Sequence, residues 1–308
     1  MSGEPTQSKE ERKQVEREER ERKRLEKHDL GQLKGQQARG KAERFLTRTT
    51  SGVIYAVVTL ACLLVSQITT TLLVCVYAWL CCSEFYRMMR MAGRMPNELI
   101  GLIASLAFPI AASFSYVWTG AAVYVFVTAV GIWYVLTPRA NVSDVAVTIF
   151  GPLYTSLLFT AIIYFRGTDS SMLGGVFTFA VMLSIWANDA FAYIVGTRFG
   201  KHKLAPKISP NKSWEGFFGG MIGSVLIWVL ISVLKLSSLT IPAAIITGIV
   251  CGVFGVFGDL FESRIKRSVG VKDSGNLMPG HGGMLDRSDS MLFGCMAAAF
   301  VMRMGGFL

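Results

Sequence analysis

Charge is scarce in this sequence, and the scarcity decides its class. Only 17% of the 308 residues are charged, whereas 52% are hydrophobic. This composition is too apolar for an ordinary soluble protein, and the alternating pattern of a membrane barrel is missing as well. Because hydrocarbon offers the backbone no hydrogen-bond partners, each spanning segment must be a helix of about 20 residues. The sequence therefore predicts an all-α polytopic integral membrane protein.

Motifs that would indicate other chemistry are also missing. The six cysteines lie in apolar stretches without the C-x-x-C spacing of metal sites. Zinc is not expected at His281, since no second His or Cys lies nearby. No Ser stands in a G-x-S-x-G elbow, so a Ser/His/Asp hydrolase is not expected either. The first 45 residues lack an apolar core, and we expect the first spanning helix, rather than a cleaved signal peptide, to direct insertion.

Charged residues are densest in residues 1–48. The run from Lys9 to Asp29 alternates in sign and has almost no apolar stripe, which is typical of a solvated helix or a disordered arm. Nearly cancelling charges attract phosphate weakly, so we expect no nucleic-acid partner. Residues 1–48 are thus predicted to be a charged cytoplasmic tail.

Apolar runs predict about nine transmembrane helices. We divide them into an N-terminal group, 49–170, and a catalytic region with cytoplasmic loops, 171–308. The first two runs are nearly fused around Gln67 and could instead form one long tilted helix. The expected spans are 50–66, 68–86, 98–115, 117–137, 143–165, 172–196, 217–235, 241–262 and 289–307.

Most Lys and Arg residues between the predicted spans fall on one side. With a cytoplasmic N-terminus, the inner loops hold the basic clusters at 87–94, 198–212 and 264–287, and the outer loops hold little beyond Arg166 and Lys235. This distribution is the positive-inside pattern. Both large polar segments of the chain are therefore predicted to face the cytoplasm.

The first polar segment, 188–220, begins inside a predicted span. Asp189 shares a helix face with Tyr193 and Gly196, at spacings of four and seven residues, and Asn188 adjoins it. Such a face could line a substrate site. Its polar groups could equally hold neighbouring helices together.

A turn is expected after that helix, opening the next span. Hydroxyls, a lysine and a carboxylate meet there at a helix N-terminus, where free N–H groups and the helix dipole favour phosphate. An ordinary helix cap, with Ser213 or Asn211 as the capping residue, explains the same pattern. The polar residues of this turn are Ser209, Lys212, Ser213 and Glu215.

The second polar segment begins while an apolar run is still in progress. Asp259, Ser263 and Lys266 follow that run at spacings of four and three residues, so they share one helix face. A salt bridge alone would explain a carboxylate followed by a cation. Ionisable groups at the membrane are costly, however, and this makes them functional candidates.

Glycines around His281 permit a loop whose N–H groups turn toward an anion, although they do not form a Walker motif. Asp286 and Asp289 follow three residues apart at the start of the last span, so both can face one ion. Their oxygens suit Mg²⁺, which commonly binds one or two carboxylates together with substrate phosphates. Nearby cations would neutralise phosphate charge. The glycines and cations concerned are Gly282, Gly283, Lys266, Arg267, Lys272 and Arg287.

The segment from Ser263 to Asp289 closely resembles the signature of phosphatidate cytidylyltransferases, also known as CDP-diacylglycerol synthases. That signature reads S-x-x-K-R, four residues, K-D, and then P-x-H-G-G-x-x-D-R-x-D. The stretch 209–216 is similar to the family's second motif, S-P-K-K-T-x-E-G, with Asn211 and Ser213 in place of Lys and Thr. The matched signature positions are Ser263, Lys266, Arg267, Lys272, Asp273, Pro279, His281, Gly282, Gly283, Asp286, Arg287 and Asp289.

The resemblance implies transfer of CMP from CTP to phosphatidic acid, giving CDP-diacylglycerol and pyrophosphate. The ionised lipid phosphate needs no strong base, so catalysis would rest on alignment and charge neutralisation. We hypothesise that Asp259 and Asp286 hold Mg²⁺ with Asp289 beside them, and the resemblance implies K⁺ as a second cation. We assign Asp259, Lys266, Arg267, Lys272, Asp286 and Arg287 to catalysis, and Asn188, Asp189, Ser209, Lys212, Ser213, Glu215, Ser263, His281, Gly282 and Gly283 to substrate binding.

Other kinds of protein share parts of this pattern. A CDP-archaeol-type synthase or a CTP-dependent polyprenol kinase would use CTP with another lipid acceptor. An anion transporter would also carry polar groups in the membrane, but transporters usually show internal repeats, and this sequence shows none. The resemblance further implies a homodimer. The compact length favours the bacterial plasma membrane, with the active site facing the cytoplasm.

Overall fold

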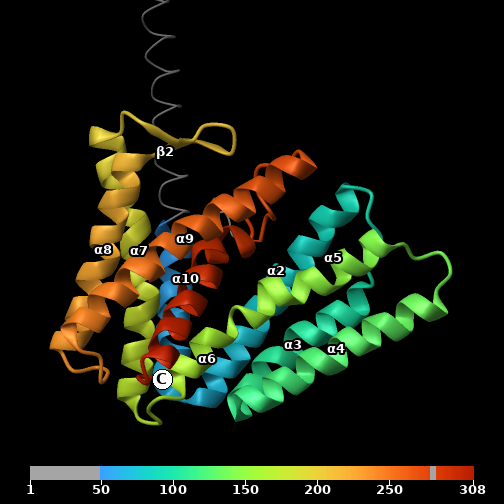
Figure 1. Ribbon diagram of the computed structural model, residues 1–308, viewed down its shortest axis with the longest axis horizontal. Helices are drawn as coiled ribbons and strands as arrows, with labels where there is room; N and C mark the ends of the chain where they lie inside the picture. The colour runs from blue at the N-terminus through green and yellow to red at the C-terminus, as the bar shows by residue number, and fades with distance from the viewer. Residues whose placement is uncertain (1–48, 278–281) are drawn as a thin grey trace, which may run out of the picture. The chain divides into compact units, whose positions relative to one another are not determined.

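The computed structural model describes residues 49–277 and 282–308, and residues 53–308 form one compact unit. The tail 1–48 and His281 lie outside the described residues, so the expectations for them stay predictions. The elements, most of which are labelled in Figure 1, are a helix Thr49–Val65, α2 Gln67–Met91, α3 Glu98–Phe114, α4 Tyr116–Leu136, α5 Val142–Pro152, a π-helical turn Leu153–Leu157, α6 Thr160–Arg166, α7 Met172–Phe199, β1 Lys203–Ala205, β2 Ser209–Ser213, α8 Trp214–Val233, α9 Ile241–Val269 and α10 Leu285–Met304.

The first two apolar runs are separate helices because the chain breaks at Ser66. The backbone of Ser66 is extended, with φ −165° and ψ 168°. Its hydroxyl accepts a hydrogen bond from the Thr69 N–H, and the Thr69 hydroxyl accepts one from the Ser66 N–H, both at 3.1 Å. This reciprocal capping box starts α2 afresh. The alternative of one long tilted helix is therefore wrong.

Six described helices are long and apolar enough to cross a membrane, and Thr49–Val65 and α3 are shorter apolar helices. The prediction of an integral membrane protein is confirmed. A count of nine spans goes beyond these six helices and stays a prediction, as does the orientation of the N-terminus. The six candidate spans are α2, α4, Val142–Arg166, α7, α8 and α9.

The predicted span 143–165 is not one continuous α-helix. A π-helical turn, Leu153–Leu157, separates α5 from α6 and directly follows Pro152. Proline lacks an N–H to continue the helical hydrogen bonds, which is a common cause of such local rewinding. The turn directs Tyr154 inward, where its ring lies 5.3 Å from that of Phe261 on α9.

A small hairpin replaces the predicted turn before α8. β1 and β2 pair antiparallel, with Lys203 opposite Ser213 and Ala205 opposite Ser209. The expectation of a turn at Ser209 is wrong, because pairing with β1 satisfies the backbone groups of this stretch in an extended form. In Figure 1 the hairpin projects beyond the ends of α7 and α8. The all-α prediction thus holds for the apolar helices, with this two-stranded exception.

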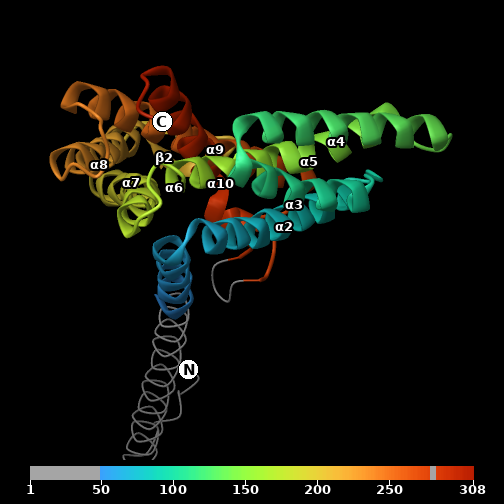
Figure 2. The same cartoon turned by 90° about the horizontal axis from the view of Figure 1, so that it is seen from below.

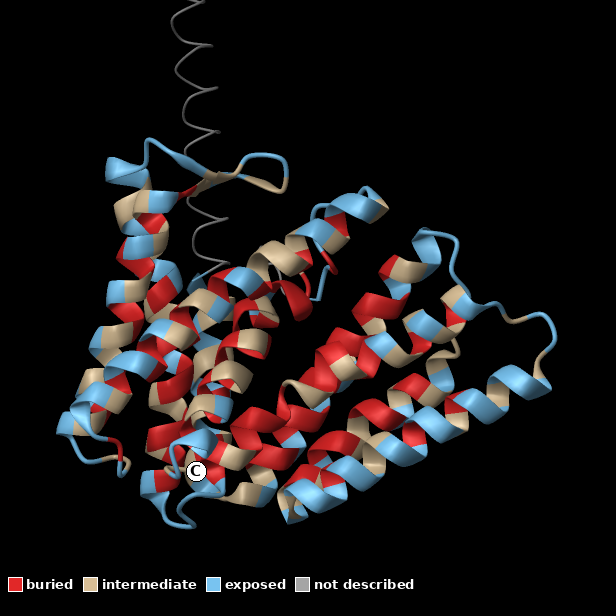
Figure 3. Cartoon of the chain, viewed as in Figure 1, coloured by how far each residue is buried: buried red, intermediate tan, exposed pale blue. Residues whose placement is uncertain are grey.

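Burial divides the helices into two groups. Figure 3 shows buried positions concentrated where α2, α6 and α10 meet, while much of α4 is exposed. On α4, Val117 and Val135 are 80% and 79% exposed although the helix is apolar on all sides. Such a surface suits contact with lipid. Both views place α7 and α8 at one end of this unit and α3 and α4 at the other (Figures 1 and 2).

Three helices meet backbone to backbone around Asn188 of α7. A Cβ at Gly220 of α8 would lie 2.8 Å from the Asn188 side-chain oxygen, and one at Gly252 of α9 would lie 3.1 Å from it. Small residues permit such close approach. The contact fixes α7, α8 and α9 relative to one another, and these helices form the wall of the cavity described next.

Candidate active site

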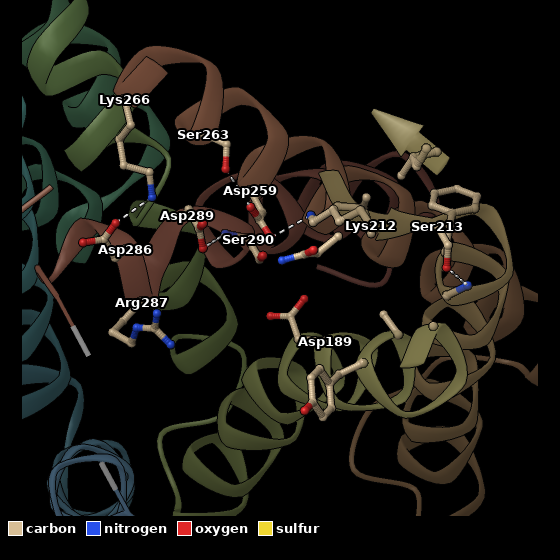
Figure 4. Close-up of a pocket in the computed structure, with 18 of the residues that line it drawn as sticks. Asp189, Lys212, Ser213, Asp259, Ser263, Lys266, Asp286, Arg287, Asp289 and Ser290 are labelled. Carbon is tan, nitrogen blue, oxygen red and sulfur yellow. Dashed lines mark hydrogen bonds and ion pairs between the residues drawn. The ribbon is translucent and has the colours of Figure 1, made fainter. Parts of the chain in front are cut away.

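A cavity of about 720 Å³ lies between α7, α8, α9 and the first turns of α10, with the hairpin and residues 272–273 at its edge. Figure 4 shows its polar side chains converging from these elements. Residues far apart in the sequence thus share one space. The charged lining residues are Asp189, Lys212, Asp259, Lys266, Arg267, Lys272, Asp273, Asp286, Arg287 and Asp289.

The hairpin contributes a lysine to this cavity. Nζ of Lys212 on β2 lies 2.6 Å from Oδ2 of Asp259 on α9, and the two side chains are 23% and 30% exposed. Oδ1 of Asp259 accepts a hydrogen bond from the Ser263 hydroxyl at 3.2 Å, as their helical spacing predicts. Because both members of the ion pair are partly exposed, a ligand in the cavity can reach either charge (Figure 4).

Lys266 forms a second ion pair that is much more deeply buried. Its Nζ lies 2.6 Å from Oε2 of Glu262 and 2.6 Å from Oδ1 of Asp286. The Glu262 side chain is completely buried, and that of Asp286 is 4% exposed. One cation therefore joins α9 to the first turn of α10. Removing it would leave two carboxylates buried without compensation, which is strongly unfavourable.

The other oxygen of Asp286 anchors the glycine-containing loop. Oδ2 accepts hydrogen bonds from the Ser274 N–H at 2.8 Å and from the Gly283 N–H at 2.7 Å. The Ser274 hydroxyl lies 2.9 Å from the same oxygen. The anion toward which the Gly283 N–H turns is therefore a carboxylate of the protein itself. Gly282, with φ +85°, supplies the left-handed backbone that this bend requires.

Three carboxylates point into the space between α7, α9 and α10: Asp189, Asp259 and Asp289 (Figure 4). Asp289 accepts a hydrogen bond from the Ser290 N–H at 2.7 Å. Asp189 has no ion-pair partner among the described residues. Like charges gathered in one place favour a cation between them, and hard oxygen ligands are those that Mg²⁺ prefers.

The fit of these carboxylates to magnesium depends on how many ligands the protein must supply. Within 49–277 and 282–308, no three His, Cys, Asp or Glu side chains converge as a complete metal cage. Mg²⁺ does not require one, since it commonly binds one or two carboxylates, water and substrate phosphates. Asp259 and Asp289 meet that requirement. Oδ2 of Asp286 accepts the hydrogen bonds of Ser274 and Gly283, whereas Oδ1 has Lys266 as its one described partner and keeps a lone pair with which it could also bind the ion.

Three cations at the cavity have no carboxylate partner among the described residues. Arg267 donates a hydrogen bond to the Val271 carbonyl at 3.1 Å, and the side chains of Lys272 and Arg287 are exposed. All three line the cavity. Unpaired cations at a partly open site are suited to bind phosphate oxygens.

The structure brings most, but not all, of the predicted site residues together. All six residues assigned to catalysis line the cavity, and so do Asp189, Ser213, Lys212, Ser263 and Asp289. Asn188 does not, because it is completely buried between helices, and its side-chain N and O have no hydrogen-bond partner in the described part of the chain. Of the described residues, Ser209, Glu215, Gly282 and Gly283 are also absent from the lining.

At the start of α8 the structure contains a helix cap, and the assignment of Ser213 and Glu215 to substrate binding stays a prediction. The Ser213 hydroxyl accepts a hydrogen bond from the Gly216 N–H at 3.2 Å. The Glu215 carboxylate accepts one from the Lys201 N–H at 3.2 Å, and it lies 2.7 Å from Nδ1 of His202. Ser213 therefore caps a helix, and Glu215 secures the chain that leads into the hairpin.

Sequence reasoning missed a contribution from the N-terminal half. Glu84 and Arg87 of α2 both bond to Ser274, in the segment that follows α9, and Glu84 also binds the start of α10. Glu262 was not assigned a role either, although it pairs with Lys266. A signal was present, since Glu84 is a carboxylate inside a predicted span, and such residues are functional candidates by default.

The chain is similar to a known protein family and to several of its named members. The model of the cytidylyltransferase family matches residues 46–304. A protein named phosphatidate cytidylyltransferase from Bacillus subtilis is 31% identical over 252 residues, which cover 80% of this chain and 93% of the relative.

Shorter but closer matches carry the same name. In the protein from Staphylococcus epidermidis, 155 residues are 43% identical, covering 50% of this chain and 58% of that relative. In the protein from Mycobacterium tuberculosis, 168 residues are 34% identical, covering 54% of this chain and 49% of that relative. These alignments span about half the length of the relatives concerned.

Proposed function

We propose that this chain, which belongs to the cytidylyltransferase family, transfers CMP from CTP to phosphatidic acid and releases pyrophosphate. The products would be CDP-diacylglycerol, a lipid, and pyrophosphate, which is soluble. The carrying observation is the cavity itself, in which cations without carboxylate partners and carboxylates meet among membrane-length helices. A reaction that joins a nucleotide to a lipid needs such a meeting place.

The geometry supports a reaction that depends on placement rather than on a strong base. The phosphate monoester of the lipid is already ionised, so its oxygen can attack the α-phosphorus of CTP in line with the departing pyrophosphate. Lys212, Lys272 and Arg287 would neutralise the triphosphate and the leaving group. Lys212 would do so by exchanging Asp259 for a phosphate oxygen, since the pair is partly exposed.

Asp259 and Asp289 would hold a magnesium ion, and Asp286 would join them through the lone pair of Oδ1 that Lys266 does not use. When bound, the ion would supply charge neutralisation at the reacting phosphates. The carboxylates of Asp189, Asp259 and Asp289, which face one space, support this assignment (Figure 4). A monovalent cation such as K⁺ would be the second ion, as the family resemblance implies.

The proposal includes a place in the cell. About nine spans with a cytoplasmic N-terminus would put the cavity at the cytoplasmic face, where CTP is available. The basic residues of the hairpin and of the segment after α9 support that side. We assign the protein to a bacterial plasma membrane, as a homodimer whose helices approach closely through small residues.

The direct test is pyrophosphate release by the detergent-purified full chain. CTP, phosphatidic acid and Mg²⁺ are supplied together and then omitted one at a time. We expect release only when all three are present, and a strong loss in Asp289→Asn. Asp169→Asn serves as the matched control, because Asp169 is an exposed carboxylate outside the cavity.

Each other result has a definite meaning. Pyrophosphate release with an ether-linked or isoprenoid phosphate acceptor, but not with phosphatidic acid, would show that the enzyme transfers CMP to a different lipid acceptor. Conversion of CTP to CDP in the presence of a polyprenol would show that the protein is a CTP-dependent polyprenol kinase and not a cytidylyltransferase. Wild-type rates in Asp289→Asn would remove this residue from the metal site.

A further inference from the structure

Glu84 of α2 is a buried carboxylate whose partners all belong to the other half of the chain. The residue is 8% exposed. Its Oε1 accepts a hydrogen bond from the Met284 N–H, and its Oε2 accepts one from the Leu285 N–H, both at 2.9 Å. The Ser274 hydroxyl lies 2.8 Å from Oε2 as well. Every described hydrogen bond of this carboxylate therefore connects α2 to residues 274–285.

These bonds hold both ends of one loop. Ser274 stands shortly after α9 ends, and Leu285 is the first residue of α10. Arg87, one turn further along α2, donates a hydrogen bond to the Ser274 carbonyl. The described signature residues of the second polar segment lie on α9, between α9 and α10, or at the start of α10. The N-terminal half thus holds Ser274 and the start of α10, close in the sequence to several of these residues.

The carboxylate of Glu84 also fills a position that an anion would otherwise take. A helix of 20 residues such as α10 directs unpaired N–H groups and the positive end of its dipole from its N-terminus. The N–H groups of Met284 and Leu285 are bonded to Glu84, and that of Gly283 to Asp286. These three amides already have carboxylate partners, so they are not free to bind a substrate phosphate.

Glu84 and Asp286 are joined through Ser274. The Ser274 hydroxyl lies 2.8 Å from Oε2 of Glu84 and 2.9 Å from Oδ2 of Asp286. The loop makes room for the carboxylate of Glu84, because a Cβ at Gly275 or Gly283 would collide with it. Ser274 therefore links Glu84, through its hydroxyl, to Asp286, through its N–H, and Asp286 in turn accepts a hydrogen bond from Lys266.

We infer that Glu84 is a positioning residue for the active site, an internal anion that holds Ser274 and the start of α10 so that Asp286 and Lys266 stand correctly for transfer. This inference rests on the proposed function. It assigns the N-terminal half a part in catalysis without contact to substrate. Because Glu84 is not among the residues that line the cavity, loss of its carboxylate should lower kcat and leave the KM for CTP nearly unchanged.

The test compares three variants of the full chain in detergent: Glu84→Gln, Glu84→Asp and Glu98→Gln. Gln keeps the size of Glu84 but removes its charge and one acceptor, whereas Asp keeps the charge on a shorter side chain. Glu98 is the matched control, since it is an ion-paired carboxylate of the neighbouring helix α3 with Arg90 as its partner. The readouts are kcat and KM for CTP, and hydrogen exchange at the amides of 283–285.

We expect Glu84→Gln to lower kcat about 10- to 100-fold, as loss of a supporting partner typically does, with KM for CTP within twofold of wild type. Glu84→Asp should recover part of that loss. Exchange of the Met284 and Leu285 amides should speed up at least tenfold in Glu84→Gln, and Glu98→Gln should match wild type in every readout.

Two results would overturn the inference. One is a Glu84→Gln variant with wild-type kcat and unchanged exchange at 283–285. The other is a rise in the KM for CTP with kcat unchanged, which would make Glu84 part of nucleotide binding. If the wild type itself releases no pyrophosphate, the proposed function fails, and the exchange measurement still decides whether Glu84 holds the loop.

Discussion

Two lysine–carboxylate pairs stand in the same cavity and differ in how they are built. Lys266 lies between Glu262 and Asp286, with side chains 10% exposed or less. Lys212 meets Asp259 alone, and both members are partly exposed. The first pair joins two neighbouring helices, α9 and α10. The second joins a helix to a hairpin that extends away from the helices.

The difference in burial indicates different roles: the buried pair supports the fold, and the partly exposed pair can exchange its partners for substrate or metal. A buried cation shared by two carboxylates cannot leave without exposing them to each other in a poorly solvated place, so the Lys266 cluster is a fixed part of the framework. An exposed pair gains little from its mutual attraction. Lys212 and Asp259 can therefore separate when a phosphate or a metal ion offers each of them a better partner. Substitutions should reveal this division.

Lys266→Met should have the largest effect because it breaks the buried cluster. Glu262 and Asp286 would remain as buried like charges, at a cost of about 3–5 kcal/mol. We expect a large fall in the thermal unfolding midpoint together with loss of activity. Lys207→Met is the control, since Lys207 is an exposed lysine of the hairpin loop. An unchanged midpoint would show that the cluster does not support the fold.

Asp259→Asn should lower activity strongly with little effect on the fold. We expect a loss of about 100- to 1,000-fold in kcat, the range seen when one group that stabilises transition-state charge is removed. The thermal midpoint should stay near that of wild type, because the pair is partly exposed. If instability instead matched that of Lys266→Met, the comparison between the two pairs would fail.

Lys212→Met should act mainly on nucleotide binding. A charge-assisted hydrogen bond to phosphate contributes about 1.5–3 kcal/mol, so the KM for CTP should rise at least about tenfold. Stability should hardly change, for the reason given for Asp259. A KM equal to that of wild type would mean that Lys212 stays with Asp259 during turnover. Lys203→Met on β1 controls for general loss of hairpin charge.

Ser213→Ala should have the smallest effect and distinguishes a cap from a substrate ligand. Loss of a helix N-cap costs about 1 kcal/mol, so the thermal midpoint should fall slightly while the KM for CTP stays constant. A raised KM for CTP with an unchanged thermal midpoint would show that the Ser213 hydroxyl binds the phosphates of CTP. Ser209→Ala, at the other end of β2, is the matched control.

The sequence predicted what depends on local pattern. Apolar runs located the helices, and spacings of three and four residues placed Asp259 beside Ser263. The family signature located the cavity. The features that the sequence did not predict depend on contacts between distant segments. The pairing of β1 with β2, the close packing that buries Asn188 and the bonds from Glu84 to the far end of the chain have no signature in local periodicity.

The two lysine pairs illustrate that limit. The spacing in the sequence permitted Lys266 to bond its own helix neighbour, as it does with Glu262 at i−4. Nothing in the spacing could tell that Asp286 would complete the same cluster, or that Lys212 would take Asp259. Partner choice was set by how α10 and the hairpin dock onto α9. That docking depends on helix packing in three dimensions.

The glycines behind the cavity have a consequence for genetics. A Cβ would lie 2.6 Å from Val195 at position 219 and 2.7 Å from the Val225 backbone at position 248, so even alanine would push α7, α8 and α9 apart. A saturation mutagenesis screen for growth should therefore find two sets of intolerant positions. One set would be the charged residues that face the cavity. The other would be the glycines at the contacts between the helices, which do not line the cavity at positions 219 and 248.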